Sequence, residues 1–139
     1  MAKHCEIFDH TADVGLAATA DSLVELFEAM AEGLAEMICP TDQVKPAQTK
    51  MITLDAEDTG ALVVDFLSKV MVTMETELFT LASVNVLSAS QVHIEAELKG
   101  EPYDQTRHEF QTEVKAVTYH QLSVARKDGK WSAQVILDI

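Results

Sequence analysis

The segment FDHTADVGL, residues Phe8 to Leu16, gathers polar side chains in a short loop between two apolar runs. The runs at residues 3–8 and 14–20 each have the composition of a β-strand. A loop that only reverses the chain usually uses Gly, Pro or Asn. This loop instead contains Asp9, His10, Thr11 and Asp13. Carboxylate, hydroxyl and imidazole groups are metal ligands, so the loop is a candidate cation site.

Two amphipathic helices are expected after this pair of strands. Ser22 and Glu25 have the spacing of a capping box. From Leu23 to Ile38 the apolar residues recur at helical intervals, and Pro40 ends the helix. A second helix is expected from near Asp58. Its apolar residues share one face: Leu62, Val63, Phe66, Leu67, Val70, Met71 and Met74.

Beyond the second helix, which ends around residues 75–78, apolar and polar residues alternate as they do in half-buried strands. Gly100 to Asp104 is expected as a turn or longer loop, and Lys127 to Lys130 as a hairpin turn with Asp-Gly at its tip. The segments expected as strands, besides the first two, are residues 50–54, 84–87, 92–98, 110–125 and 131–137. These elements predict an α+β fold, a single domain over residues 1–139 built as a two-layer sandwich of two helices on a mostly antiparallel sheet.

The composition, 47% hydrophobic and 24% charged, is that of a folded globular protein. Ten basic and 23 acidic residues give a net charge of −13, which disfavours tight binding to nucleic acid because phosphate binding depends on Lys and Arg. The acidic surface suits a basic protein partner or a cation, or serves solubility alone. No apolar run could span a membrane, and the N-terminus lacks a signal-peptide core, so we expect a cytoplasmic protein. Cys5 and Cys39 lack metal-site spacing and are expected as reduced thiols.

A second dense segment, EVKAVTYHQL, lies far downstream at Glu113 to Leu122. Together with FDHTADVGL, with GEPYDQTRHEF (Gly100 to Phe110) and with the terminal LDI (Leu137 to Ile139), it gives the chain a close resemblance to the archease family. These are small proteins that activate the RNA-splicing ligase in tRNA maturation. The resemblance covers essentially the whole chain in order and implies one compact domain around a strand-helix-strand-strand core. Gln121 departs from it, since Gly is common at that position.

The resemblance implies a metal site. In archeases the last Asp of the DHTAD string is a metal ligand, and the terminal Asp and final carboxylate complete the site. The matching positions are Asp13, Asp138 and Ile139. Oxygen ligands favour calcium or magnesium. The residues alone leave other interpretations open, because loop side chains often bond loop amides and chain ends commonly fray.

Lys115 matches a lysine implicated in activation, so the resemblance assigns ligase activation to Asp13, Lys115 and Asp138. A lysine in a strand is otherwise usually solvated. Asp9, His10 and His120 are candidates for supporting hydrogen bonds around the site. For His120, which shares a strand face with Val114 and Ala116, a hydrogen-bonded core position is favoured over a ligand.

Other polar residues are expected in structural roles. Tyr103-Asp104 and Arg107-His108 are expected to brace the following strand, and His4 and His93 have no assigned partner. Glu75 and Glu77 place carboxylates at the negative end of a helix, which is electrostatically unfavourable. We therefore expect these two residues to have another role, as part of the acidic surface.

Nothing in the sequence indicates independent catalysis. There is no GxGxxG, P-loop, GxSxG or CxxC motif, and no nucleophile lies beside an evident base. The resemblance implies a non-catalytic protein cofactor that binds the tRNA-splicing RNA ligase and promotes its guanylylation and multiple turnover. One alternative is a chaperone-like modulator of the oligomeric state or specificity of RNA-modifying enzymes such as a tRNA methyltransferase. Another is a small metal-dependent hydrolase that uses Asp9, His10, Asp13 and Asp138.

Overall fold

The computed structural model of the protein describes the backbone of residues 3–10 and 13–139 and the side chains of residues 3–7 and 13–139. Strands and helices follow one another in the order β-β-α-β-α-β-β-β-β, with one short 3-10 turn. The elements are β1 (Lys3–His10), β2 (Asp13–Ala20), α1 (Leu23–Ile38), η1 (Thr41–Gln43), β3 (Gln48–Asp55), α2 (Thr59–Thr76), β4 (Phe79–Ala89), β5 (His93–Pro102), β6 (Ala116–Lys127) and β7 (Lys130–Asp138).

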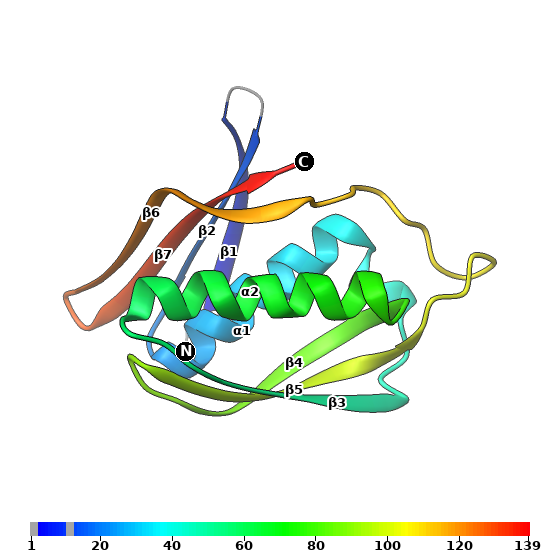
Figure 1. Ribbon diagram of the computed structural model, residues 1–139, viewed down its shortest axis with the longest axis horizontal. Coiled ribbons are helices and arrows are strands. Elements are labelled where there is room, and N and C mark those ends of the chain that lie inside the picture. Colours follow the sequence, from blue (N-terminus) through cyan, green and yellow to red (C-terminus); the bar gives the residue numbers. More distant parts are fainter. Residues whose placement is uncertain (1–2, 11–12) are drawn as a thin grey trace.

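The strands form two sheets, and the helices lie between them (Figure 1). The four-stranded sheet has the order β1-β2-β7-β6 and the three-stranded sheet the order β3-β5-β4, with every pairing antiparallel. α1 packs on β2 and β4, and α2 on β6 and β4, so each helix contacts both sheets. The predicted α+β class and the packing of two helices on antiparallel strands are confirmed. The division into two sheets was not predicted from the sequence.

The two predicted helix starts are confirmed in detail. Ser22 Oγ accepts a hydrogen bond from the Glu25 N–H at 3.3 Å and donates one to Glu25 Oε1 at 3.1 Å. Asp58 Oδ1 accepts from the Ala61 N–H at 2.8 Å. These side chains satisfy backbone donors that the first helical turn leaves unpaired.

The core lies between the two helices and the inner faces of both sheets. Phe27 of α1 and Phe66 of α2 meet edge to face, with ring centroids 5.7 Å apart, and both are fully buried. Burial of such a side chain contributes about 1.5–3 kcal/mol. Every residue of the apolar face predicted for the second helix is buried. A helix with so wide an apolar face can be covered from two sides, which explains why a sheet lies on each side of the helix layer.

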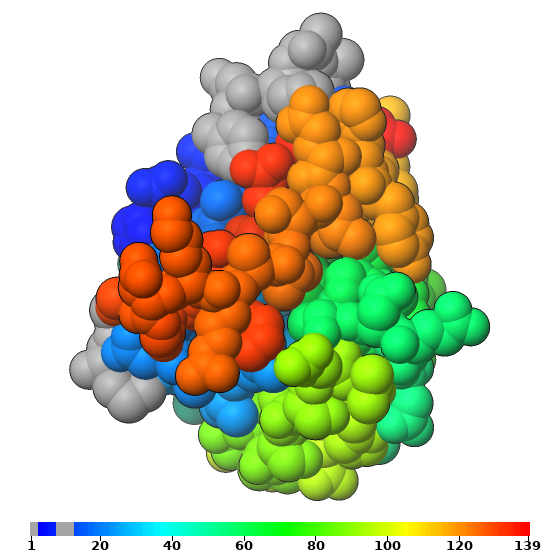
Figure 2. Space-filling model, turned by 90° about the vertical axis from the view of Figure 1, so that its left-hand side faces the viewer, coloured from blue at the N-terminus to red at the C-terminus, as the bar shows by residue number. Residues whose placement is uncertain are grey.

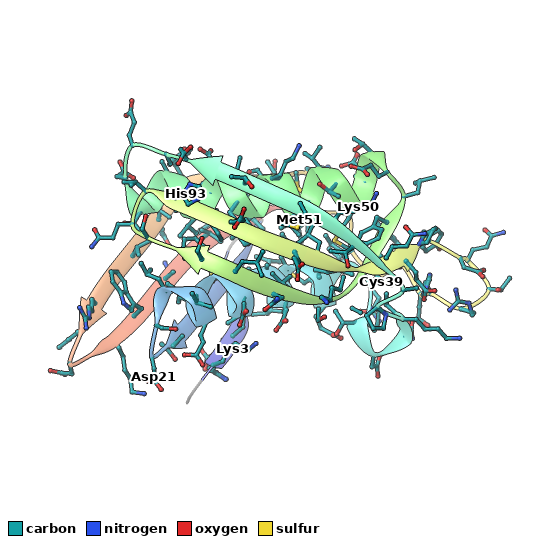
Figure 3. The ribbon with its side chains drawn as sticks, turned by 90° about the horizontal axis from the view of Figure 1, so that it is seen from below. Lys3, Asp21, Cys39, Lys50, Met51 and His93 are labelled. Atoms are coloured by element: carbon teal, nitrogen blue, oxygen red, sulfur yellow. The ribbon has the colours of Figure 1, made fainter. Side chains whose placement is uncertain are left out.

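Acidic side chains of α1 connect the two sheets. Glu32 and Glu28 accept hydrogen bonds from the backbone N–H groups of Val84 and Val86 on β4, an edge strand, at 3.1 and 2.9 Å. Both carboxylates also pair with Lys3 of β1, at 3.3 and 3.5 Å. Figure 3 labels Lys3, which lies beside α1. These contacts occupy edge donors that would otherwise be available to another chain.

Two predicted boundaries were wrong. Gly100 lies within β5 rather than in a turn, at a place where a Cβ atom would overlap the carbonyl oxygen of Thr80. The strand predicted at residues 110–125 begins only at Ala116. The part before it is not a strand, and within it the Gln111 N–H donates a 2.8 Å hydrogen bond to the Ile38 carbonyl at the end of α1.

The predicted hairpin between β6 and β7 is confirmed. Lys127 pairs with Lys130, and Asp128 and Gly129 both have positive φ, 55° and 78°. This is the geometry of a type I′ turn, which matches the twist of the strands it joins. Figure 2 looks onto this side of the molecule, where β6 (orange) lies beside the start of α2 (green). Within the described residues, no helix is long and apolar enough to span a membrane.

Candidate functional site

The first residue of β2 and the last residue of β7 lie side by side at one end of the four-stranded sheet. Val14 pairs with Leu137, so the next position along the two antiparallel strands places Asp13 opposite Asp138. His10 pairs with Asp13 on one side, and Ala116 pairs with Asp138 on the other. Figure 1 shows the end of β7, marked C, beside β2 and near the start of β6. The register therefore forms a cross-strand row, which we call the carboxylate row: His10, Asp13, Asp138 and Ala116.

Lys115 is joined to this row through its backbone. Its N–H donates a 2.7 Å hydrogen bond to the carbonyl oxygen of Asp138, and its side chain is exposed. Leu137, immediately before Asp138, is fully buried, so the end of β7 is held firmly. The structure thus brings together the three residues that the sequence analysis assigned to activation: Asp13, Lys115 and Asp138.

The carboxylate row puts two like charges at the ends of neighbouring strands, an arrangement that is unfavourable where the side chains approach each other. Asp13 is half-buried and Asp138 is exposed. Cross-strand neighbours have Cβ atoms roughly 5 Å apart, and like charges at that separation destabilise a sheet. A cation between the carboxylates would remove the repulsion. The donor atoms are all oxygens, which fits calcium or magnesium.

The side-chain ligands at this place are few. Among the described residues, no three His, Cys, Asp or Glu side chains are grouped closely enough to hold a metal ion. A site here would use the two Asp side chains and the main-chain carboxylate of Ile139. The side chains of Asp9 and His10 lie outside the described residues, so their expected supporting role stays a prediction.

His120 is exposed on β6, so the expected core position was wrong. The pairing of β6 with β7 shifts register between Thr118 and Ser123, and Gln121 has a φ of 52° within this irregularity. A bulge breaks the two-residue alternation on which the prediction rested. The backbone at Gln121 is left-handed, a conformation that Gly adopts without strain, which agrees with the expectation of Gly at the matching position.

A second polar cluster, built on Glu101, was not recognised as a unit from the sequence. This carboxylate is 6% exposed and accepts hydrogen bonds from Arg107 Nη1 and Nη2 at 3.0 and 2.9 Å and from the Lys45 N–H at 2.9 Å. His108 Nδ1 accepts from the Asp104 N–H, so its Nε2–H donates to Glu101, at 2.9 Å. The Arg107 hydrogen bonds, aided by the other donors, lower the pKa of Glu101 to about 2.

The Glu101 cluster fastens the segment at residues 103–115 to the body of the protein. That segment ends at Lys115, so the cluster helps to fix the approach to the carboxylate row. Arg107 and His108 were expected to brace the following strand, but their hydrogen bonds run to Glu101 of β5, the strand that precedes the segment. No short motif could have revealed Glu101 as the partner of Arg107 and His108. Glu101 takes that role only because strand β5 places it in a buried position.

The two cysteines are free thiols. Cys5 is partly buried, and burial raises the pKa of its thiol to about 11. Because the thiolate is the reactive form of cysteine, this residue is a poor nucleophile at neutral pH.

Known proteins resemble this chain over nearly its full length. The sequence profile of the Archease protein family (MTH1598/TM1083) matches residues 5–139. A protein named archease from Pyrococcus abyssi is 33% identical over 141 residues, which is 99% of each chain. One from Methanopyrus kandleri is 35% identical over 137 residues, covering 96% of this chain and 98% of its own.

Two solved structures share the fold. The solution structure of Methanobacterium thermoautotrophicum protein 1598 has a TM-score of 0.80 and 32% identity, covering 97% of this chain and 98% of that chain. The crystal structure of a Thermotoga maritima protein, described as an archease and possible chaperone, has a TM-score of 0.61 at 18% identity and covers 96% of both chains. The family profile and the relatives lead to one conclusion: this chain belongs to the archease family.

Proposed function

We propose that this protein is a non-catalytic protein cofactor of the tRNA-splicing RNA ligase. It would promote guanylylation of the ligase and allow it many turnovers in tRNA processing. The observation that supports this most strongly is the meeting of Asp13, Asp138 and Lys115 at one sheet end in a chain of the archease family. These residues come from distant parts of the sequence.

In this proposal the carboxylate row holds a calcium or magnesium ion through Asp13, Asp138 and the Ile139 carboxylate. Such an ion would supply positive charge against the phosphates of a nucleotide on the partner enzyme. Lys115, whose side chain is exposed, offers a second positive group at the same end of the sheet. Its backbone hydrogen bond to Asp138 holds the two groups in one relative position.

The net charge supports docking on a basic protein rather than on RNA itself. A net charge of −13 attracts a positively charged partner. The affinity of that complex should weaken as the salt concentration rises. The two free thiols agree with a reducing compartment, and we place the protein in the cytoplasm.

Multiple-turnover RNA ligation by the cognate ligase with GTP tests this proposal. The comparison is between no addition, the wild-type protein, Asp13→Ala, and Asp65→Ala, which removes an exposed carboxylate from α2 far along the chain. We expect the wild type and Asp65→Ala to raise turnover and Asp13→Ala to fail. If the wild type leaves turnover unchanged, the ligase proposal is overturned.

A second candidate function is a chaperone-like modulator of the oligomeric state or specificity of RNA-modifying enzymes. The description of the Thermotoga maritima protein as a possible chaperone favours keeping it. This function needs the acidic surface but not the carboxylate row. Asp13→Ala would therefore retain full effect on the assembly of such an enzyme, measured by light scattering, while it loses ligase activation.

A further inference from the structure

A largely apolar pocket of about 380 Å³ lies where the two helices end. The last turns of α1 and α2, the start of β4 and the segment at residues 103–115 enclose it. Figure 1 shows this segment (yellow) passing on the side where both helices end. Buried side chains from three elements and from this segment line it: Ile38, Met71, Met74, Phe79 and Val114. We call it the helix-end pocket.

Three large apolar residues at the helix-end pocket face solvent. Leu78 is 66% exposed, Phe110 54% and Tyr103 39%. Isolated exposed apolar residues are common on protein surfaces, but several gathered around one hollow mark an interaction site.

The backbone conformation at Leu78 is strained for a residue that has a side chain. Leu78 follows the α2 cap residue Glu77 and has a φ of 49°, in the left-handed region. Gly is the usual residue at this position of a helix end, because a Cβ atom is strained there. The Tyr103 N–H donates a 2.7 Å hydrogen bond to the Leu78 carbonyl, which fixes the conformation. Stability alone would favour Gly, so the exposed leucine side chain points to a contact with another molecule.

The rim of the helix-end pocket is mainly acidic, although Lys50 Nζ lies 5.1 Å from the ring centroid of the lining residue Phe79. The carbonyl ends of two helix dipoles converge there, and neither helix has a basic residue in its last turn. Glu75 and Glu113 also line the pocket, and neither has an ion-pair partner among the residues that the structure describes. Glu77, by contrast, pairs with Lys50 at 2.6 Å. An apolar hollow with a negative rim is complementary to an apolar side chain flanked by positive charge.

The helix-end pocket and the carboxylate row are connected by two consecutive residues of the chain. Val114 lines the pocket, and the next residue, Lys115, bonds to Asp138. A protein bound at the pocket would therefore lie beside the carboxylate row.

We infer that the helix-end pocket is a docking site for a protein segment that inserts a large apolar side chain and flanks it with Lys or Arg. This inference rests on the proposed function, because the partner that carries the segment is the RNA ligase. The pocket supplies binding affinity, whereas the carboxylate row acts on the bound enzyme. Changes at the two places should therefore affect different parameters of activation.

The test titrates each variant into the multiple-turnover ligation assay and measures binding to immobilised ligase in parallel. Leu78→Gly removes the apolar side chain while relieving the backbone, so it should fold well, and Phe110→Ser removes a second rim residue. We expect each to raise the concentration needed for half-maximal activation at least tenfold and to leave maximal turnover unchanged. Leu87→Ser, at an exposed apolar residue of β4 away from the pocket, should match the wild type. Glu75→Lys should weaken binding, and Asp65→Lys on the same helix should weaken it less.

Unchanged half-maximal concentrations for Leu78→Gly and Phe110→Ser would overturn the docking site even if the wild type activates the ligase. If the wild type binds the ligase without activating it, and the pocket variants lose that binding, the docking site stands and the proposed function fails. A dimer of the wild type that both variants convert to a monomer would assign the pocket to a second copy of this chain and overturn the inference.

Discussion

The backbone N–H of Lys115 donates a 2.7 Å hydrogen bond to the carbonyl oxygen of Asp138, which ties the entry of β6 to the end of β7. Asp13 lies on the other side of Asp138 in the same sheet. Lys115 therefore has two separable features: a backbone donor that positions a carboxylate and an exposed side chain that carries charge.

Substitutions at Lys115 should separate these two features. Lys115→Met keeps the backbone N–H, so calcium binding should be unchanged while ligase activation falls. Lys115→Pro removes the donor and lets the end of β7 shift, so calcium affinity should fall as well. Isothermal titration calorimetry with calcium, beside the ligation assay, measures both effects. Equal calcium affinity in the two variants would show that the hydrogen bond does not position the site.

Calcium should stabilise the wild-type protein and not Asp13→Asn. A ligand that binds only the folded state adds about 2.7 kcal/mol at 100 times its dissociation constant. Asp13→Asn removes one of two opposed charges, so without metal it should be at least as stable as the wild type. Thermal unfolding with calcium and with a chelator measures this, and Asp65→Asn is the matched control. A calcium-induced rise of the same size in Asp13→Asn would rule out Asp13 as a ligand.

The stability of the protein should depend on Glu101 at acid pH. Folding lowers the pKa of this carboxyl from 4.5 to about 2, chiefly because Arg107 donates hydrogen bonds to it. A lowered pKa in the folded state means that the stabilisation is complete above pH 4.5 and is lost as the pH falls through about 2. Urea unfolding at a series of pH values should show this loss in the wild type.

Glu101→Gln is the comparison for the pH experiment. It keeps the size of the side chain but cannot become charged, so it should be less stable at neutral pH and lose less stability between pH 4.5 and 2. Asp104, whose pKa is also lowered, titrates in both proteins, so the difference between the two curves reports Glu101. Parallel curves would contradict the assignment.

Leu78→Gly should raise the free energy of unfolding, by up to about 1.5 kcal/mol. The left-handed conformation costs a residue with a Cβ atom roughly 1–2 kcal/mol, while Gly loses about 0.5–1 kcal/mol more in backbone entropy on folding. Urea denaturation measures the net effect. Leu87→Gly, within strand β4, should destabilise the protein instead. A loss of stability in Leu78→Gly would mean that the side chain packs on the fold itself.

Much of the fold was determined by local sequence. Ser22 and Asp58 cap the helices because their oxygens reach the unpaired N–H groups of the first turn. Asp128 and Gly129 form the turn because both tolerate positive φ. The paired loop and terminal motifs also sufficed to identify the family. The caps and the turn depend on residues that are close in sequence, and the family depends on sequence motifs. All of them could therefore be predicted without knowing how the chain packs.

Tertiary structure alone decided where distant groups meet. The register of β2 with β7 sets Asp13 opposite Asp138, and the bulge in β6 turns His120 to solvent against the two-residue pattern. Burial in β5 makes Glu101 the partner of Arg107, and the convergence of two helix ends creates the apolar pocket with its acidic rim. Residue spacing reports only the local period of the backbone. Strand register, bulges and the division into two sheets follow from the packing of the whole chain, because only that packing decides which groups leave water together.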